Sequence, residues 1–214
     1  MNINERISIA NRVFNDIIES KELTELMNQY LTGDLPRIIF SGVGKNWYIC
    51  EKIVKTYLSL GIHAEALDCV HALHGDLGML MGEDEKLLIF VSKSGTTEEL
   101  KRLVRIVFEL KEKGIIKNTR VVGFYLNKRE NIELADQYDN LILLPDWISY
   151  KEFPEFDSRN IVPTLSINTM QMVLDCFGIE LFEARPNLVD NYVYNHLGGN
   201  NGKILGSKNI VNTL

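Results

Sequence analysis

The sequence contains little cysteine and little histidine. Its three cysteines, Cys50, Cys69 and Cys176, are few, odd in number and far apart. This spacing fits neither a disulfide framework nor a clustered zinc site, so we expect reduced residues in the core. Among the four histidines, His71 and His74 have a spacing that suits a metal pair on a helix. No third ligand stands near them in the sequence, so no metal site is predicted.

The chain also has no excess of positive charge and no long hydrophobic run. It carries 23 lysines and arginines against 29 aspartates and glutamates, a formal net charge of -6. A general affinity for nucleic acid or for anionic membranes is therefore not expected. The first residues are charged and contain no apolar stretch, which argues against a signal peptide and a membrane anchor. We expect a cytoplasmic protein with a small ligand.

The chain does have a regular alternation of short apolar runs with amphipathic segments. Five runs predict strands that are buried on both faces, at residues 37–41, 64–67, 87–91, 120–125 and 140–144. Helical spacing predicts helices at residues 7–31, 49–58, 100–110, 166–178 and 181–194. This alternation predicts an α/β fold, with a doubly wound, five-stranded parallel sheet flanked by helices in a flavodoxin-like three-layer sandwich.

A single domain over residues 1–214 is expected from the length of the chain. It would consist of an N-terminal helical segment (1–34), an α/β core with the C-terminal helices (35–195) and a tail (196–214). Residues 146–158 have no periodicity and predict a loop. The tail is rich in glycine and asparagine and is expected to be loop-like.

The predicted strand at residues 87–91 runs into a turn with four hydroxyl side chains and one glycine. These residues, together with the two glutamates that open the next helix, are Ser92, Ser94, Gly95, Thr96, Thr97, Glu98 and Glu99. Free N–H groups at a helix N-terminus and nearby hydroxyls suit phosphate oxygens without a lysine. The glycine lets the backbone approach the anion. The same residue types suit an ordinary helix cap, and this stretch alone leaves both alternatives open.

A second turn follows the first predicted strand, at Gly42, Gly44 and Lys45. Its spacing fits neither G-x-G-x-x-G nor G-x-x-x-x-G-K-[ST], so a nucleotide loop is not predicted. Lys45 suits a developing enediolate or a phosphate at the mouth of a sheet, or else it is a solvated lysine at a helix start. Ligands of doubly wound sheets bind beyond the carboxyl ends of the strands, where both turns would lie.

Three more residues are candidates for chemistry. His74, in a His-Gly-Asp-Leu-Gly stretch, either shuttles protons or is structural. Glu152 either projects into a site from the irregular loop or is a solvated acid beside Glu155 and Asp157. His196 either ends a helix or reaches another subunit. Sequence spacing decides none of these alternatives.

In order and spacing, these segments resemble the sugar isomerase (SIS) domain family, specifically the arabinose 5-phosphate isomerases. The family's G-x-G-K turn, H-G-D-L-G-M segment and S-x-S-G-x-x-x-E turn are matched at residues 42–45, 74–79 and 92–99. Its Lys-Glu pair ahead of a Pro-Thr is matched at 151–152 and 163–164, and its His-Pro-Gly-Gly at 196–199. The five matches cover nearly the whole chain.

The resemblance implies an aldose–ketose isomerase that interconverts D-ribulose 5-phosphate and D-arabinose 5-phosphate through a cis-enediol. Glu152 is then the expected carbon base. Lys45 would face the enediolate oxygens, and His196 would open the ring or move a hydroxyl proton. Glu99 would orient Lys45 or a sugar hydroxyl, or be the base itself, with His74 close by. The implied substrate-binding residues are Ser41, Gly42, Gly44, Ser92, Ser94, Gly95, Thr96 and Thr97. No cofactor and no metal are implied.

The resemblance also implies a homotetramer in which His74 or His196 serves a neighbour's active site. It points to the supply of 3-deoxy-D-manno-octulosonate (KDO) precursors for lipopolysaccharide. Many members continue into a pair of CBS domains, which we do not expect here. Lys93, Thr96 and Leu197 replace an asparagine, a glutamate and a proline, and residues 155–162 differ from the family's small loop. An isomerase of hexose or heptose phosphates, or a non-catalytic SIS module that binds a sugar phosphate, therefore remain alternatives.

Overall fold

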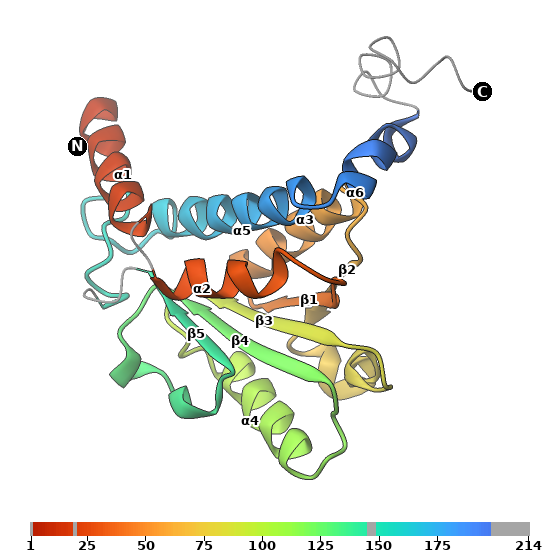
Figure 1. Cartoon of the computed structure of the whole chain (residues 1–214). Coiled ribbons are helices and arrows are strands. Elements are labelled where there is room, and N and C mark those ends of the chain that lie inside the picture. Colours follow the sequence, from red (N-terminus) through yellow and green to blue (C-terminus); the bar gives the residue numbers. More distant parts are fainter. Residues whose placement is uncertain (1, 19–20, 145–148, 198–214) are drawn as a thin grey trace.

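The computed structural model describes residues 2–18, 21–144 and 149–197 (Figure 1). Its strands form a five-stranded sheet with the order β2-β1-β3-β4-β5, and every pairing is parallel. The strands are β1 (Arg37–Gly42), β2 (Ala64–Asp68), β3 (Lys86–Ser92), β4 (Thr119–Tyr125) and β5 (Asn140–Leu143). All five predicted strands and the doubly wound parallel sheet are confirmed.

The central strand β3 shows why the apolar runs mark strands in this chain. All seven residues of β3 are buried, and the strand pairs with β1 on one side and with β4 on the other. Ile89 faces Phe40 of β1 and Val122 of β4 in the register. Because helices cover both faces of a parallel sheet, successive residues are apolar rather than alternately apolar and polar.

Helices cover the two faces of this sheet and give three layers (Figure 1). The main helices are α2 (Lys21–Tyr30), α3 (Lys45–Ser59), α4 (Glu98–Glu112) and α5 (Leu165–Glu183). Phe40 and Ile89 belong to the core that α2, α3 and α5 cover, whereas Ile39 and Phe90 belong to the core under α4. Neighbouring strand residues thus contribute to opposite cores, as the pleat requires.

The single helix predicted over residues 7–31 is wrong. The chain forms α1 (Ile3–Ile18) and then α2, and the two helices point in different directions (Figure 1). Whereas α2 contacts β5, α1 extends away from the body of the molecule. Apolar residues recur at helical spacing in both helices, so the spacing alone does not reveal a change of axis.

The C-terminal helices also differ from their predicted bounds. The helix predicted over residues 166–178 continues to Glu183, and α6 (Pro186–Asn191) follows it. Pro186 opens α6, where its missing N–H has no helical partner to lose. A 3-10 turn, η5 (Tyr192–His196), comes next. Residues 149–158 contain neither helix nor strand, as predicted for that loop.

One cysteine prediction is wrong. Cys50 and Cys69 are buried, whereas Cys176 is exposed on α5, and all three are free thiols. The neighbouring Val173 and Phe177 are buried in the core, so Cys176 lies on the opposite, outer side of the helix. A cysteine in an apolar helix is therefore a weak indicator of burial when the helix has one face in solvent.

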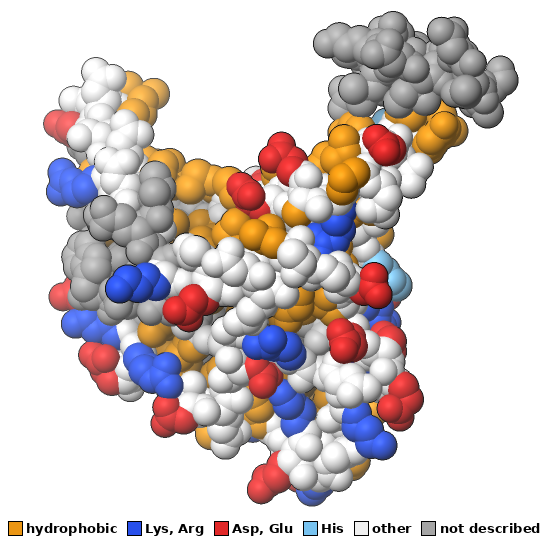
Figure 2. Space-filling view, viewed as in Figure 1, with side chains coloured by type: hydrophobic (Ala, Val, Ile, Leu, Met, Phe, Trp, Pro, Cys, Tyr) orange, Lys and Arg blue, Asp and Glu red, His pale blue; other side chains and the backbone are white. Residues whose placement is uncertain are grey.

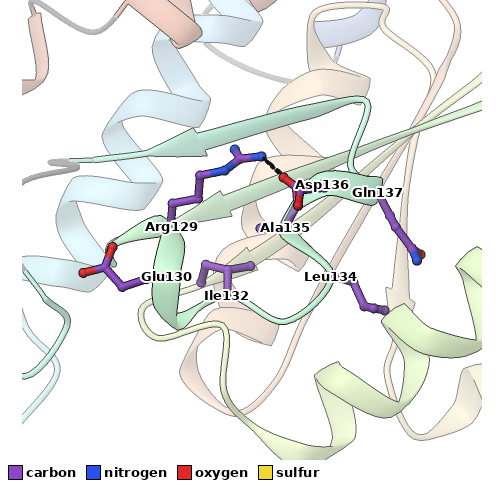
Figure 3. Close-up of a pocket in the computed structure, with 7 residues that line it drawn as sticks. All are labelled: Arg129, Glu130, Ile132, Leu134, Ala135, Asp136 and Gln137. Atoms are coloured by element: carbon purple, nitrogen blue, oxygen red, sulfur yellow. Dashed lines mark hydrogen bonds and ion pairs between the residues drawn. The ribbon is translucent and has the colours of Figure 1, made fainter.

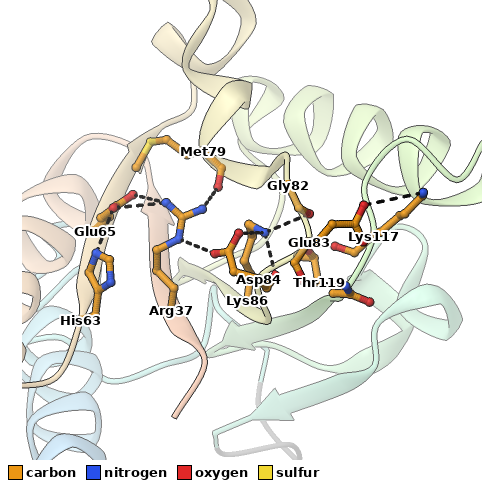
Figure 4. Close-up of polar contacts among 11 residues, drawn as sticks. Arg37, His63, Glu65, Met79, Gly82, Glu83, Asp84, Lys86, Lys117 and Thr119 are labelled. Atoms are coloured by element: carbon orange, nitrogen blue, oxygen red, sulfur yellow. Dashed lines mark hydrogen bonds and ion pairs between the residues drawn. The ribbon is translucent and has the colours of Figure 1, made fainter. Parts of the chain in front are cut away.

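Charged side chains are paired with one another at the amino ends of the strands (Figure 4). The Lys86 side chain is fully buried, and its ammonium lies 2.7 Å from Asp84 Oδ1. Arg37 lies 3.1 Å from the second oxygen of Asp84 and 3.2 Å from Glu65. The hydrogen bond from Lys86, with the charge of Arg37, lowers the pKa of Asp84. The cations Arg37 and Lys86 at this edge are therefore neutralised within the chain.

The helices α3 and α5 lie side by side with a close contact at Gly178. A Cβ atom at residue 178 would lie 2.9 Å from Cζ and 3.0 Å from Cδ2 of Tyr57, which is fully buried. The Tyr57 hydroxyl also donates a hydrogen bond of 2.9 Å to the carbonyl oxygen of Leu174. Glycine at 178 thus lets the tyrosine ring pack against the backbone of α5.

Replacing Gly178 by alanine is expected to lower the free energy of unfolding by about 1–3 kcal/mol, because the methyl group displaces a buried ring. Urea denaturation followed by circular dichroism measures this change. The matched control is Gly78→Ala, since a Cβ at residue 78 meets no atom within 4 Å. Equal stabilities of the two variants would contradict the close contact at Gly178.

Candidate functional site

The two glycine-containing turns lie at the carboxyl ends of neighbouring strands. β1 leads into α3 on one face of the sheet, and β3 leads into α4 on the other. β1 and β3 pair directly although β2 separates them in sequence, so the strand order reverses between them. Doubly wound sheets of this strand order bind ligands at such a point. Residues about fifty positions apart in sequence are thus brought to one crevice.

The residues 92–97, here called the hydroxyl turn, connect β3 to α4. The hydroxyl of Ser92 accepts a hydrogen bond of 3.0 Å from the N–H of Gly95, and the hydroxyl of Ser94 accepts one of 3.1 Å from the N–H of Thr96. Neither serine hydroxyl donates to a described residue, so each retains a proton to donate. Thr97 is the N-cap residue of α4 and makes no side-chain capping bond. The ordinary cap is therefore not formed by Thr97.

Glycine is required within the hydroxyl turn. Gly95 has a φ of +67°, and a Cβ there would lie 2.7 Å from Cδ1 of Ile132. The amide of Asn127 donates a hydrogen bond of 2.7 Å to the carbonyl oxygen of Ser94 and fixes the turn from the same side. The segment after β4 thus holds the turn in a conformation that L-residues rarely adopt.

The hydroxyl turn forms one wall of a pocket of about 500 Å³. The other walls come from α3 and from residues 149–164, here called the covering loop. The pocket is lined by Asn46, Ser92, Lys93, Ser94, Thr97, Tyr150, Lys151, Arg159, Asn160, Ile161 and Pro163. Hydroxyl, amide and cationic groups line this pocket, and no carboxylate is among the described residues that do.

The pocket contains unpaired positive charge. Lys151 and Arg159 form no ion pair with any described residue, unlike the paired cations at the amino edge of the sheet. The side-chain oxygen of Asn46 is buried and receives no hydrogen bond from the described part of the chain. Since buried acceptors are normally paired, a donor from a ligand would satisfy this oxygen.

An ion pair joins the pocket-lining Lys93 to Glu155 in the covering loop. Lys93 Nζ is 2.7 Å from Glu155 Oε1, and the two side chains are 15% and 0% exposed. Thr164 and Ser166, at the start of α5, donate backbone hydrogen bonds of 2.8 and 3.1 Å to the same carboxylate. Although burial opposes it, the bonds from Lys93, Ser166 and Thr164 lower the pKa of Glu155. Glu155 is thus an ionised, buried group, whereas the sequence grouped it with the solvated acids.

The predicted residues Lys45 and Glu99 lie at the rim of the crevice. Lys45 is the exposed first residue of α3, next to Asn46, and Glu99 is exposed in the first turn of α4. Gly44 is the N-cap residue of α3. Ser41 is fully buried and donates its hydroxyl to the carbonyl oxygen of Leu67 at 2.7 Å. The Ser41 hydroxyl therefore links β1 to β2.

The predicted base Glu152 belongs to the covering loop but does not line the pocket. Its exposed carboxylate accepts a hydrogen bond of 2.8 Å from the hydroxyl of Ser149 and one of 3.3 Å from the N–H of Ser149. These bonds lower the pKa of Glu152. The next residue on its N-terminal side, Lys151, does line the pocket, so Glu152 lies near its mouth.

The two predicted histidines lie apart. His74 is exposed at the end of a 3-10 turn after β2, which neighbours β1. His196 ends η5, where Asn195 donates a hydrogen bond of 3.2 Å to the carbonyl oxygen of Ser59 at the far end of α3. Because α3 rises about 1.5 Å per residue, that end is about 20 Å from Lys45. One chain does not bring His196 to the pocket, and residues 198–214 of the predicted tail lie outside the described residues.

Several residues that line the pocket were not predicted from the sequence. Asn46 and Lys151 are direct neighbours of the predicted Lys45 and Glu152, so their positions were within reach. No sequence pattern indicates that Arg159 and Asn160 line the pocket, because they lie in an irregular segment whose path depends on tertiary contacts.

A second pocket of about 630 Å³ lies in the connection between β4 and β5 (Figure 3). Its guanidinium group, on Arg129, is paired with Asp136 at 2.6 Å. It contains none of the residues predicted from the sequence. We therefore place the candidate site at the hydroxyl turn and not here.

Metal-binding clusters and membrane-spanning helices are both absent from the described residues. No group of three or more histidine, cysteine, aspartate or glutamate side chains gathers there in a way that would hold a metal ion. No helix among these residues is both long enough and apolar enough to span a membrane.

Known proteins resemble this chain in sequence, although no protein-family model matches it. It is 30% identical over 196 residues to an uncharacterized protein of Chlamydia pneumoniae, covering 89% of this chain and 54% of that protein. It is also 30% identical over 168 residues to arabinose 5-phosphate isomerase KpsF of Escherichia coli O6:H1 strain CFT073, covering 78% and 46%. The chain spans about half the length of these curated relatives.

Solved structures share the fold. A candidate phosphosugar isomerase from Bacteroides fragilis superposes with a TM-score of 0.73 at 22% identity, covering 92% of this chain and 96% of that one. An E. coli CFT073 protein in complex with arabinose 5-phosphate gives a TM-score of 0.64 at 24% identity, covering 86% and 93%.

Proposed function

Because this chain belongs to the sugar isomerase (SIS) domain family, we propose that it is an aldose–ketose isomerase of a phosphorylated sugar. The specific reaction that we propose is the interconversion of D-ribulose 5-phosphate and D-arabinose 5-phosphate through a cis-enediol. The name of the KpsF relative supports arabinose 5-phosphate as one member of this pair. We further propose that the reaction takes place in the cytoplasm and supplies precursors of KDO.

The observation that carries the proposal is the composition of the pocket. Its hydroxyl-turn wall offers serine hydroxyls and the N-terminus of α4, whose dipole favours an anion, and Lys151 and Arg159 add positive charge. The unpaired oxygen of Asn46 offers an acceptor to a hydroxyl group. An anion site beside a hydroxyl acceptor suits a sugar phosphate better than inorganic phosphate alone.

The proposed chemistry assigns the remaining roles. Moving a hydrogen between C1 and C2 needs a carboxylate base and a group that polarises the carbonyl. We propose Glu152 as the base, since it lies in the covering loop and is ionised near neutral pH, and Lys45 as the cation that faces the enediolate. Glu99, in the first turn of α4, is the alternative base. His74 is proposed to help in proton transfer.

We also propose a homotetramer with shared active sites. Figure 2 shows hydrophobic side chains exposed on α1 and along α5. Ile3 and Ile7 of α1 are 71% and 53% exposed, and Ile179 of α5 is 40% exposed. Such apolar surface is suited to contact with another copy of the chain. Packing between copies would also place His196 at a neighbour's pocket, where it would open the sugar ring.

Incubation of the chain in D₂O with D-ribulose 5-phosphate tests the proposal. We expect D-arabinose 5-phosphate to form and the exchangeable C–H positions to acquire deuterium, both followed by NMR. Hexose and heptose phosphates in parallel samples identify another substrate if one reacts faster. A complete lack of exchange with every sugar phosphate, in a sample that binds phosphate, would instead favour a non-catalytic binding module.

A further inference from the structure

We propose that Glu155 is a positioning residue that sets the charge of the phosphate site by holding Lys93 away from the bound anion. The hydroxyl turn would then bind phosphate through its hydroxyl and N–H groups, while the Lys93 ammonium stays fixed against the covering loop. The inference rests on the proposed function only in taking a phosphate group as the ligand.

The contacts of Glu155 fix its position completely. Both carboxylate oxygens are occupied: Oε1 receives bonds from Lys93 and the hydroxyl of Ser166, and Oε2 receives the N–H groups of Thr164 and Ser166. The N–H of Glu155 itself donates a bond of 3.1 Å to Asn160. Glu155 therefore joins the start of α5 to the covering loop and to the turn.

Lys93 is held at a defined place by this carboxylate. It lies between Ser92 and Ser94 in the hydroxyl turn, and its backbone carbonyl accepts a bond of 3.1 Å from Leu126. Its ammonium lies 2.7 Å from Glu155 and 5.6 Å from the centre of the Phe153 ring. A lysine in this position without a partner would have its charge free to contact a phosphate on the same turn.

We expect loss of the two charges of this ion pair to change phosphate affinity in opposite directions. Removing the Lys93 charge leaves an unpaired carboxylate, that of Glu155, close to the pocket, which repels phosphate. Removing the Glu155 charge leaves an unpaired ammonium, which attracts phosphate. A purely structural ion pair would behave differently, since loss of either partner would damage the turn in the same way and weaken binding in both variants.

The experiment measures the Kd of inorganic phosphate by isothermal titration calorimetry for the wild type, Lys93→Met, Glu155→Gln and the double variant. We expect Lys93→Met to raise Kd by about tenfold or more, and Glu155→Gln to lower it by about threefold or more. The double variant should return to within about threefold of the wild type, since neither charge remains.

Matched controls are Lys113→Met and Glu109→Gln, which break an exposed ion pair at the far end of α4 and should leave Kd unchanged. Circular dichroism identifies variants that fail to fold, and Lys93→Arg, which keeps the charge, should bind like the wild type. Shifts of Kd in the same direction for Lys93→Met and Glu155→Gln would overturn the proposal. So would a wild type that does not bind phosphate.

The same variants separate this inference from the proposed function. If the wild type binds phosphate with the expected opposite shifts but turns over no sugar phosphate, the isomerase proposal fails and the positioning role stands. If turnover is observed and the shifts have the same sign, the positioning role fails alone. With turnover present, Glu155→Gln should lower both KM and kcat, because tighter phosphate binding slows release of the product.

Discussion

Replacing Glu152 by glutamine is expected to reduce the turnover of D-ribulose 5-phosphate by roughly 10²–10⁴-fold, the usual contribution of a general base. The amide keeps the shape of the side chain and a hydrogen-bonding oxygen for Ser149, but it cannot accept a proton from carbon. Phosphate binding should change little, because Glu152 does not line the pocket. Steady-state kinetics together with deuterium exchange at the substrate carbon measure both effects.

The acid limb of the pH profile gives an independent check on Glu152. Hydrogen bonds from Ser149 lower the pKa of Glu152, so the base stays ionised down to a lower pH than an ordinary glutamate. Activity that requires the ionised base is therefore retained above this lowered pKa and lost below it. Ser149→Ala removes the hydroxyl bond and should move the acid limb upward in pH, whereas Glu152→Gln should remove that limb.

Glu99→Gln is the matched control for the choice of base. It removes one exposed carboxylate at the rim of the same crevice, in the first turn of α4. If Glu152→Gln retains most of the activity while Glu99→Gln loses it, Glu99 is the base and our assignment is wrong. Loss of carbon exchange in Glu152→Gln alone supports the assignment.

Replacing Ser94 and Thr97 together by alanine is expected to raise the Kd of the sugar phosphate by about 10²–10⁴-fold. Hydrogen bonds to charged groups contribute about 1.5–3 kcal/mol each, and about 1.4 kcal/mol corresponds to a factor of ten. Both residues line the pocket, and the hydroxyl of Ser94 donates to no described residue. The kcat should fall much less than the affinity, because these groups bind the phosphate and not the reacting carbons.

A second pair of hydroxyl residues provides the control for that experiment. Thr56 and Ser59 lie at the far end of α3, where their hydroxyls donate to backbone carbonyls at 3.3 and 2.7 Å. Thr56→Ala with Ser59→Ala should leave the Kd unchanged. If this control weakens binding as much as the change in the turn, the loss reflects stability and not phosphate contacts.

The strands and the two glycine-containing turns after β1 and β3 were predictable because the sequence patterns that indicate them are local. A strand buried on both faces needs an unbroken apolar run, and residues 87–91 supply one directly before the hydroxyl turn. Parallel strands then bring their carboxyl ends to one edge, so Gly44 and Ser92 could be placed near each other from the sequence. The change of direction between α1 and α2 has no comparable local signal in the sequence, so it was not predicted.

The ion pair between Lys93 and Glu155 could not be predicted, because its partners are far apart in sequence. Lys93 and Glu155 are separated by 62 residues, and each departs from the family pattern that the sequence resembles. Nothing in the acidic segment around Glu155 indicates burial. Glu155 is buried because its carboxylate accepts hydrogen bonds from the N–H groups of Thr164 and Ser166 at the start of α5.

The helix α5 connects the contact between Gly178 and Tyr57 to the contact between Ser166 and Glu155. Ser166 lies twelve residues before Gly178, which is about 18 Å along the helix at 1.5 Å per residue. A tilt of about 3° at the tyrosine ring would therefore displace Ser166 by roughly 1 Å relative to Glu155. Displacements of that size are large on the scale of catalytic positioning. The packing of Tyr57 against Gly178 is therefore expected to affect the position of Ser166 beside Glu155.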